Sequence, residues 1–426
     1  MTIDDEHETD SHTIEYRQAD SELGGDDLDE ESDEESPSSL TADDVDDVLL
    51  YTLDWSVQSL LERIGGTFDI NPAFQRRDAW NADRKSKYIE SLMLGLPVPQ
   101  VVLAEDKTRK GSFIVLDGKQ RLVTMKQFGD PNDSFRTFKL KNLQFLSSLN
   151  GMSLQEIQNE SPESRSYVDN FLAQPVRTIV VRNWGKPAVL YQIFVRLNQG
   201  SLPLSPQELR QALFPGSFSS WINNRSARSA AIHRARRTKG EDFRMRDAEM
   251  LLRSVALQQN LESYDGDLRQ FLDTMCETGN KDWESNRERY ESLADRTELA
   301  IERTEKIFKL TNSFLRYDGE KEQYVRRFNI AVFDTMCIVL SSEELTDSLV
   351  SQFSQEIRMA FEQLCSDSRE FENALKSTTK TARATATRIK LFAEAVERCT
   401  GATLDASARA NALLDRVTST SKNKAS

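Results

Sequence analysis

The chain has 426 residues, a formal net charge of −14, 38% hydrophobic residues and 29% charged residues. This length is enough for two or three domains. No run approaches the roughly 18 consecutive apolar residues that a membrane-spanning helix needs, and the N-terminus lacks the basic and apolar regions of a signal peptide. The sequence therefore predicts a cytoplasmic protein without a membrane partner.

Acidic residues are concentrated in the first 47 positions. This segment holds 20 Asp and Glu against one basic residue, Arg17, so the rest of the chain is mildly basic. It has too few large apolar side chains to offset the chain entropy lost on folding, which predicts a disordered tail over residues 1–47. Two interpretations of the tail stay open: a solubilising segment, or an acidic mimic of nucleic acid that covers a basic face of the body.

The cysteines are widely spaced and form no CxxC pair. They are Cys276, Cys337, Cys365 and Cys399. All four lie in helical-looking sequence, which predicts buried, reduced thiols of the kind found in a cytosol. A zinc site is not expected, because no histidine lies beyond His233.

Between residues 48 and 215 helical and extended patterns alternate. In chain order, the apolar pattern first predicts a helix over 55–64, a short extended piece over 68–70 and a helix over 83–94. Strands over 97–104 and 112–116 and a helix over 120–128 follow. The last elements are an extended pair within 135–146, a strand over 176–181 and an apolar amphipathic segment over 190–197. Asp54 is the expected N-cap of the first helix. Ser153 and Ser205 begin Ser-x-x-Glu capping boxes, and Pro206 suits a first helical position.

From about residue 216 the pattern changes to long helices, and no proline follows Pro215. The 3.6-residue period predicts helices over 282–316, 321–341, 343–365 and 382–399, with a frayed tail over 419–426. The sequence therefore predicts an α+β fold. A small mixed sheet with flanking helices would form a domain over 48–215, and an all-α domain would follow over 216–418.

Chemistry is expected where the strand 112–116 runs directly into Asp117-Gly118 and a helix. A strand that ends in Asp-Gly and opens a helix leaves free backbone N–H groups at the helix N-terminus, where they can bind an anion. Gly118 allows a phosphate to approach closely, and Lys119 and Arg121 add positive charge. Asp117 could hold a Mg²⁺-bound water or orient an arginine. The motif alone is also compatible with a turn and helix start that bind nothing.

Several sequence blocks occur in the order of one known family. They are Asn71–Trp80, Arg84–Leu92, Val115–Leu122, Phe194–Gly200 and Leu204–Arg210. Together they resemble the N-terminal domain of GmrSD-type restriction systems, a family of the ParB/sulfiredoxin-like superfamily. The resemblance covers about residues 50–215, and a looser similarity extends through Glu249–Arg253 and Phe328–Leu340.

The resemblance implies roles for individual residues. The DGQQR-type motif of the family falls on Asp117, Gly118, Gln120 and Arg121, with Lys119 where the family usually has its first Gln. The FQR element falls on Phe74, Gln75 and Arg76, and the RLN element on Arg196, Leu197 and Asn198. The implied catalytic residues are Asp117 and Arg121, and Asp117 is also the implied metal ligand. The implied nucleotide-binding residues are Gly118, Lys119, Gln120, Gln75, Arg76 and Asn198. Glu208 has two open readings, a capping-box residue or a catalytic base.

The resemblance also implies a function. Some family members are implicated in hydrolysis of a nucleoside triphosphate that gates a nuclease, which multi-part members carry as a C-terminal HNH-like domain. An HNH site needs histidines, and residues 234–426 contain none. The expected function is therefore a nucleotide-binding, NTP-hydrolysing module of a prokaryotic defence or restriction system. It would use an NTP with Mg²⁺ and act with a separate nuclease subunit, and the long helix over 282–316 could also pair with a second copy.

A basic stretch supports an alternative from another class, a non-enzymatic DNA-binding or adaptor protein. Eight basic residues lie between Arg225 and Arg246, opposed only by Glu241 and Asp242. Such a cluster can bind phosphates in a salt-dependent way. The candidate nucleic-acid contacts are Arg228, Arg234, Arg236 and Arg237. A solvated helical face and a dock for the acidic tail are the other readings. An intrinsic nuclease that uses Asp117 with Mg²⁺ is a third function, but too few clustered carboxylates are visible for a two-metal site.

Overall fold

The computed structural model describes residues 41–68, 80–107, 109–197, 205–242, 244–376 and 379–424. The acidic segment over 1–40 lies outside these residues, and so do Phe74, Gln75, Arg76 and Asn198. Within the described part of the tail, Asp43–Asp46 form a short helix, α2, where the sequence predicts disorder. At the other end α19 continues to Lys424 through the segment expected to fray.

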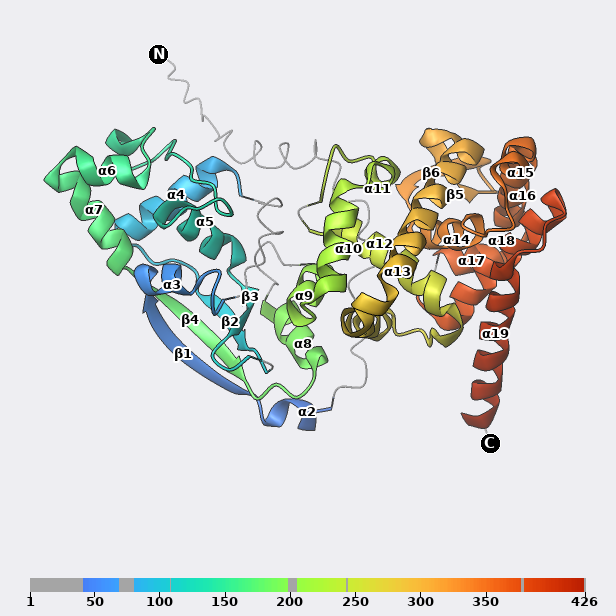
Figure 1. The fold of residues 1–426 in the computed structure, drawn as a ribbon, viewed down its shortest axis with the longest axis horizontal. Helices are drawn as coiled ribbons and strands as arrows, with labels where there is room; N and C mark the ends of the chain where they lie inside the picture. The colour runs from blue at the N-terminus through green and yellow to red at the C-terminus, as the bar shows by residue number, and fades with distance from the viewer. Residues whose placement is uncertain are drawn as a thin grey trace, which may run out of the picture.

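A four-stranded sheet forms the centre of the N-terminal part (Figure 1). Its strands are β1 (Leu49–Ser56), β2 (Val101–Glu105), β3 (Phe113–Asp117) and β4 (Pro175–Arg182). The strand order is β1-β4-β2-β3. The β1–β4 and β2–β3 pairs are antiparallel and the β2–β4 pair is parallel. This mixed sheet, followed by a helical region, confirms the predicted α+β class.

Each face of the sheet is covered by its own apolar cluster. Val101, Leu103, Val115 and Val180 belong to the cluster on one face. The helices that contribute to it are α3 (Val57–Arg63), α4 (Ala82–Met93), α5 (Lys119–Gly129), α6 (Leu154–Glu160) and α7 (Pro162–Ala173). The alternate strand residues face a second cluster, to which α8 (Pro187–Leu197) and α9 (Pro206–Leu213) contribute. The alternation of strand side chains thus separates the two clusters.

The first predicted helix begins later than expected. Asp54 lies within β1 and forms an ion pair with Arg177 on β4, with 3.2 Å between Oδ1 and Nε. Ser56 is the N-cap instead, and its Oγ accepts a hydrogen bond from Ser59 N at 3.2 Å. The expectation of a helix from Trp55 was therefore wrong. Residues 49–56 pair with β4 over their whole length, and this ladder overrides the local helical pattern.

Residues 135–146 form no strand pair, which corrects a second expectation. Three consecutive amides, those of Gln144, Phe145 and Leu146, donate hydrogen bonds to the carboxylate of Glu90 on α4 at 2.7–3.1 Å. The amide of Lys141 donates to Ser86 Oγ on the same helix. Side chains of α4 therefore satisfy backbone groups that a partner strand would otherwise have bound.

Beyond α9, the residues that the structure describes are helical apart from one hairpin and short connecting loops, and a single large apolar cluster forms the core of this region (Figure 1). Its helices are α10 (Ser217–Arg228), α11 (Ala230–Arg236), α12 (Arg246–Asn260), α13 (Leu268–Asn312), α14 (Ile330–Leu340), α15 (Asp347–Gln352), α16 (Ser354–Asp367), α17 (Arg369–Lys376), α18 (Ala382–Thr400) and α19 (Asp405–Lys424). Single-turn 3₁₀ helices lie at Ser147–Leu149 and Leu261–Ser263.

Three of the predicted long helices have different bounds in the structure. The segment expected as a helix over 321–341 holds strand β6 (Gln323–Phe328) before α14, and β5 (Leu315–Asp318) replaces the end of the helix expected over 282–316. The strands form an antiparallel hairpin in which the Tyr317 and Tyr324 rings lie 5.2 Å apart. The Asp318-Gly319 pair and the aromatic residues around it are a hairpin signal that the helical periodicity concealed. The segment 343–365 likewise divides into α15 and α16.

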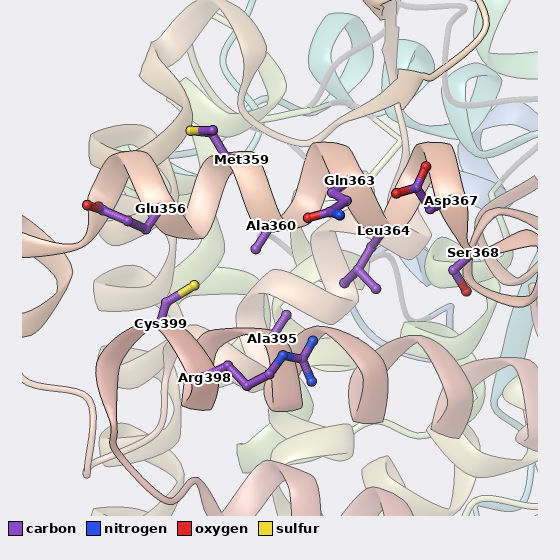
Figure 2. Close-up of a pocket in the computed structure, with 10 residues that line it drawn as sticks. All are labelled: Glu356, Met359, Ala360, Gln363, Leu364, Asp367, Ser368, Ala395, Arg398 and Cys399. Carbon is purple, nitrogen blue, oxygen red and sulfur yellow. The ribbon is translucent and has the colours of Figure 1, made fainter.

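A shallow groove runs between α16 and α18 (Figure 2). Met359, Leu364 and Cys399 contribute apolar atoms to it, and Glu356 and Arg398 contribute charges. Figure 2 shows the Cys399 side chain directed toward α16. Cys399 is half-buried, whereas Cys276, Cys337 and Cys365 are buried. The prediction of buried thiols is thus confirmed for those three cysteines. None of the described helices is long and apolar enough to cross a membrane.

We expect iodoacetamide to modify Cys399 first in the native protein. Burial raises the pKa of all four thiols, to about 12 for Cys276 and Cys365, and the thiolate is the reactive form. The nearby Arg398 opposes this rise for Cys399. Peptide mass spectrometry of the native and the urea-unfolded protein measures the order. Equal labelling of Cys337 and Cys399 in the native state would contradict the burial described above.

Candidate functional site

The candidate site begins where β3 ends. The β2–β3 register shifts between Val102, which is paired with Asp117, and Leu103, which is paired with Val115, so Leu116 is an extra residue on β3. Such a bulge re-aims the residues that follow it. Gly118 then adopts φ = 97°, a left-handed conformation that favours glycine, and is the N-cap of α5. The first hydrogen bond of the helix runs from Leu122 N to Gly118 O, which leaves the preceding amides of the first turn outside the helical ladder.

Arg121 folds back over this turn. Its Nη2 lies 2.5 Å from Asp117 Oδ2, and its side chain is only 9% exposed. A Cβ added to Gly118 would lie 3.2 Å from both Nε and Nη2 of Arg121 and 3.0 Å from Val101 Cγ2. Glycine is therefore required here for its φ angle and for the close approach of the guanidinium. Of the two roles that the sequence suggests for Asp117, the structure shows the second, the orientation of an arginine.

Lys119 lies in a second buried ion pair. Its Nζ is 3.0 Å from Glu208 Oε1, with the two side chains 8% and 7% exposed. Glu208 is also the third residue of the capping box that begins α9: its Oε2 accepts from Ser205 N at 2.8 Å, and its own amide donates to Ser205 Oγ at 3.1 Å. The capping-box reading of Glu208 is thus confirmed. Through its contact with Lys119, the Glu208 carboxylate also connects the N-terminus of α9 with that of α5. The two residues lie 89 positions apart in the sequence.

Several buried polar atoms of α5 and the neighbouring α4 have no hydrogen-bond partner within the described ranges. They are Nε of Arg121, Oε1 of Gln120, Oγ1 of Thr124 and the hydroxyl of Tyr88. Tyr88 belongs to α4, which packs against α5, and burial raises the pKa of its phenol while the charge of Arg121 opposes the rise. Trp80 covers the Tyr88 ring edge-on at 5.6 Å. A buried polar atom without a partner is unfavourable unless something else binds it.

Tyr88 was not expected as a site residue from the sequence. It occupies an apolar position of an amphipathic helix, where an aromatic side chain is normally core. The one available signal is its hydroxyl, which usually finds a partner when it is buried.

Helix α9 also contacts the helical region on its far side. Arg210 is 2% exposed, and its Nε lies 2.7 Å from Asp273 Oδ1 on α13. The Tyr191 hydroxyl of α8 donates to the same carboxylate oxygen at 3.3 Å, and Arg210 Nη1 donates to Gln207 Oε1 at 2.7 Å. One short helix therefore connects the Asp117–Arg121 turn with α13.

Two of the four predicted nucleic-acid contacts, Arg234 and Arg237, lie against α13. Arg234 Nε is 3.1 Å from Glu305, and Arg237 donates to the carbonyl of Thr311 at 2.7 Å, near the C-terminus of that helix. The side chain of Arg236 is 4% exposed and forms an ion pair with Asp242. Arg228 is exposed. Glu305 of α13 thus pairs with one of the four candidate arginines, a contact that the sequence did not indicate. Binding of nucleic acid by these residues stays a prediction.

No cluster of three or more His, Cys, Asp and Glu residues with metal-binding geometry occurs in the parts of the chain that the structure describes. Asp117 therefore belongs to no such cluster of described residues. A divalent ion there would need further oxygen ligands, such as phosphate oxygens, which is the usual manner of Mg²⁺ binding to nucleotides.

The geometry of this site can be compared with known proteins. Residues 57–215 match the family model described as GmrSD restriction endonuclease, N-terminal domain. This segment is a GmrSD N-terminal domain. The match covers the Asp117–Arg121 turn, Tyr88 and the capping box of α9, so the resemblance to the GmrSD N-terminal domain is confirmed over residues 57–215. No curated protein and no solved structure matches the chain.

Proposed function

We propose that this protein is a nucleotide-binding component of a restriction-type defence system, and that the N-terminus of α5 binds the phosphates. The family of residues 57–215 supports the system. The observation that carries the site is that two buried donors, Nε of Arg121 in the first turn of α5 and the hydroxyl of Tyr88 on the neighbouring α4, have no partner among the described residues. Backbone amides at a helix N-terminus form an anion site, and the side chains of Arg121 and Tyr88 would add donors to it.

The Asp117–Arg121 pair supports this reading. Asp117 engages Nη2 of Arg121, while Nε of the same guanidinium has no partner among the described residues. A guanidinium held on one side by a carboxylate keeps a fixed orientation and still offers a donor to an anion. Arg121 would therefore bind phosphate with little loss of side-chain entropy. Lys119, paired with Glu208, would contribute its charge at longer range.

Hydrolysis is the finer part of the proposal. A Mg²⁺ ion bound to the triphosphate would approach Asp117, whose side chain is 24% exposed, and would neutralise charge on the transferred phosphoryl group. Gln75, Arg76 and Asn198, outside the described residues, are the proposed remaining contacts. Since residues 234–426 contain no histidine, DNA cleavage by an HNH-type site would come from a separate nuclease subunit.

Arg121→Ala is expected to abolish stabilisation by nucleotide. A ligand at about 100 times its Kd adds roughly 2.7 kcal/mol to the free energy of unfolding. Thermal melts of the protein with each NTP and Mg²⁺ measure this gain. Arg177→Ala is the matched control, because it removes an exposed arginine of β4 in the same domain.

Tyr88→Phe separates binding from folding. It removes only a hydroxyl that lacks a described partner, so the melting temperature without nucleotide should stay the same or rise. The nucleotide-induced shift should shrink. A full shift in both Tyr88→Phe and Arg121→Ala would refute the site. No shift of the unaltered protein with any NTP would favour the DNA-binding adaptor, with the exposed Arg228 as the next residue to test.

A further inference from the structure

The outer edge of the sheet is apolar and exposed. Five of the nine large apolar side chains that are exposed in the described ranges lie close together in sequence: Val45, Leu49, Leu50, Tyr51 and Leu53. The last four belong to β1, and Leu50 is 65% exposed. Figure 1 shows β1 as a long outer strand beside β4. Scattered exposed apolar residues are ordinary, but a contiguous group on one strand indicates an interaction surface.

β1 is also an open strand edge. Its one strand neighbour in the described sheet is β4, and its pairing with β4 runs without a register shift from Leu49 to Ser56. Edge strands are usually protected from pairing by a proline, a lysine, a bulge or an inward-pointing charge. β1 has no proline, no lysine and no bulge in that pairing. Its only charged residue, Asp54, is paired with Arg177.

We propose that β1 pairs with β1 of a second copy of this chain, so that two four-stranded sheets join across a twofold axis near Tyr51. A strand edge binds another extended strand through its unpaired amides and carbonyls. A closed twofold pairing covers both edges at once, whereas an open edge would lead to aggregation.

The sequence of β1 fits its own copy. In a continuous antiparallel sheet, directly opposite residues point to the same face. With the axis at Tyr51, Leu49 lies opposite Leu53 of the second copy and Tyr51 lies opposite Tyr51. On the other face Leu50 lies opposite Thr52. No charged residue faces another, and apolar and aromatic cross-strand pairs stabilise such sheets. The strand β1 itself has a single charged residue and offers little to a strongly charged partner such as nucleic acid, whereas a second copy supplies the matching strand.

Sedimentation velocity of the full chain over a concentration series tests the pairing. The expected result is a dimer that Leu50→Lys weakens by at least about tenfold, since the lysine enters the interface twice by symmetry. Met359→Lys is the matched control, because Met359 is 56% exposed in the α16–α18 groove, and it should leave the dimer intact. A monomer at every concentration, or a dimer that Leu50→Lys leaves unchanged, would overturn the proposal.

A second variant tests the register without relying on loss of association. Tyr51→Cys places two cysteines opposite each other across the axis, so a short bismaleimide should link two chains in high yield. Leu310→Cys, which is 50% exposed on α13 of the helical region, should give no cross-linked dimer. Cross-linking of both variants to the same extent would indicate random collision and would refute a β1 interface.

Discussion

Glu208→Ala is expected to lower the free energy of unfolding by about 3–5 kcal/mol, because it removes the carboxylate that faces the buried Lys119 ammonium. Loss of the capping box at Ser205 adds roughly 1 kcal/mol. Glu208→Gln should lose less, since glutamine can complete a capping box. Urea unfolding of the three proteins measures these differences.

The chain contains a natural control for this substitution. Glu156 forms a capping box with Ser153, and its Oε1 lies 2.7 Å from Lys139 Nζ, but both charged side chains are about half exposed. Water screens this pair, so Glu156→Ala should destabilise the protein far less than Glu208→Ala. Lys139 and the capping serine together lower the pKa of Glu156 to about 2. The stabilisation from that pairing is present above the usual pKa of a glutamate and is lost as the pH falls through the lowered value.

The comparison of Glu156 with Glu208 isolates the effect of burial on the stability that a Lys–Glu pair contributes. Both have the same local sequence pattern and the same types of partner, and they differ in exposure. Equal losses of stability in Glu156→Ala and Glu208→Ala would show that the Lys119–Glu208 pair contributes no more than a helix cap. The connection between α5 and α9 would then have no special importance for the site.

Local sequence predicts what depends on neighbours in the chain. The capping boxes at Ser153 and Ser205, the turn at Gly118 and the strand before it can all be found from residues within four positions of one another. Such features follow from backbone conformation and short-range hydrogen bonds, so a single sequence is enough to find them.

The errors come from contacts between distant segments. The sequence over 135–146 is compatible with a strand pair. In the structure, three of its backbone amides donate hydrogen bonds to Glu90, which lies more than 50 residues away in the chain. In the basic stretch, Glu305 of α13 pairs with Arg234, a contact that the sequence did not indicate, while the nucleic-acid contacts themselves stay a prediction. The Lys119–Glu208 pair escapes prediction for the same reason, although each of the two residues belongs to a recognisable motif. Sequence patterns identify charged or apolar positions, and the tertiary fold decides what they meet.

The helical region has its own buried charge network, centred on Asp334 of α14. Arg253 of α12 donates to both carboxylate oxygens, at 3.2 Å from Nε and 2.5 Å from Nη2. Nη2 of Arg388 on α18 lies 3.7 Å from Oδ2, and its Nη1 donates to Thr379 O at 2.6 Å. The three charged side chains are at most 6% exposed. One carboxylate thus connects three helices of the core.

Asp334→Ala is expected to destabilise the protein by about 3–5 kcal/mol, since two buried guanidiniums would lose their shared carboxylate. Combining it with Arg253→Met should recover part of the loss, because an apolar side chain of similar length then replaces one uncompensated charge. Asp295→Ala is the control: its carboxylate is 71% exposed and pairs with Arg225, so its removal should have a small effect. Urea unfolding monitored by circular dichroism gives the values. If the double variant is less stable than Asp334→Ala alone, Arg253 stabilises the core through its packing and its charge is not the source of the loss.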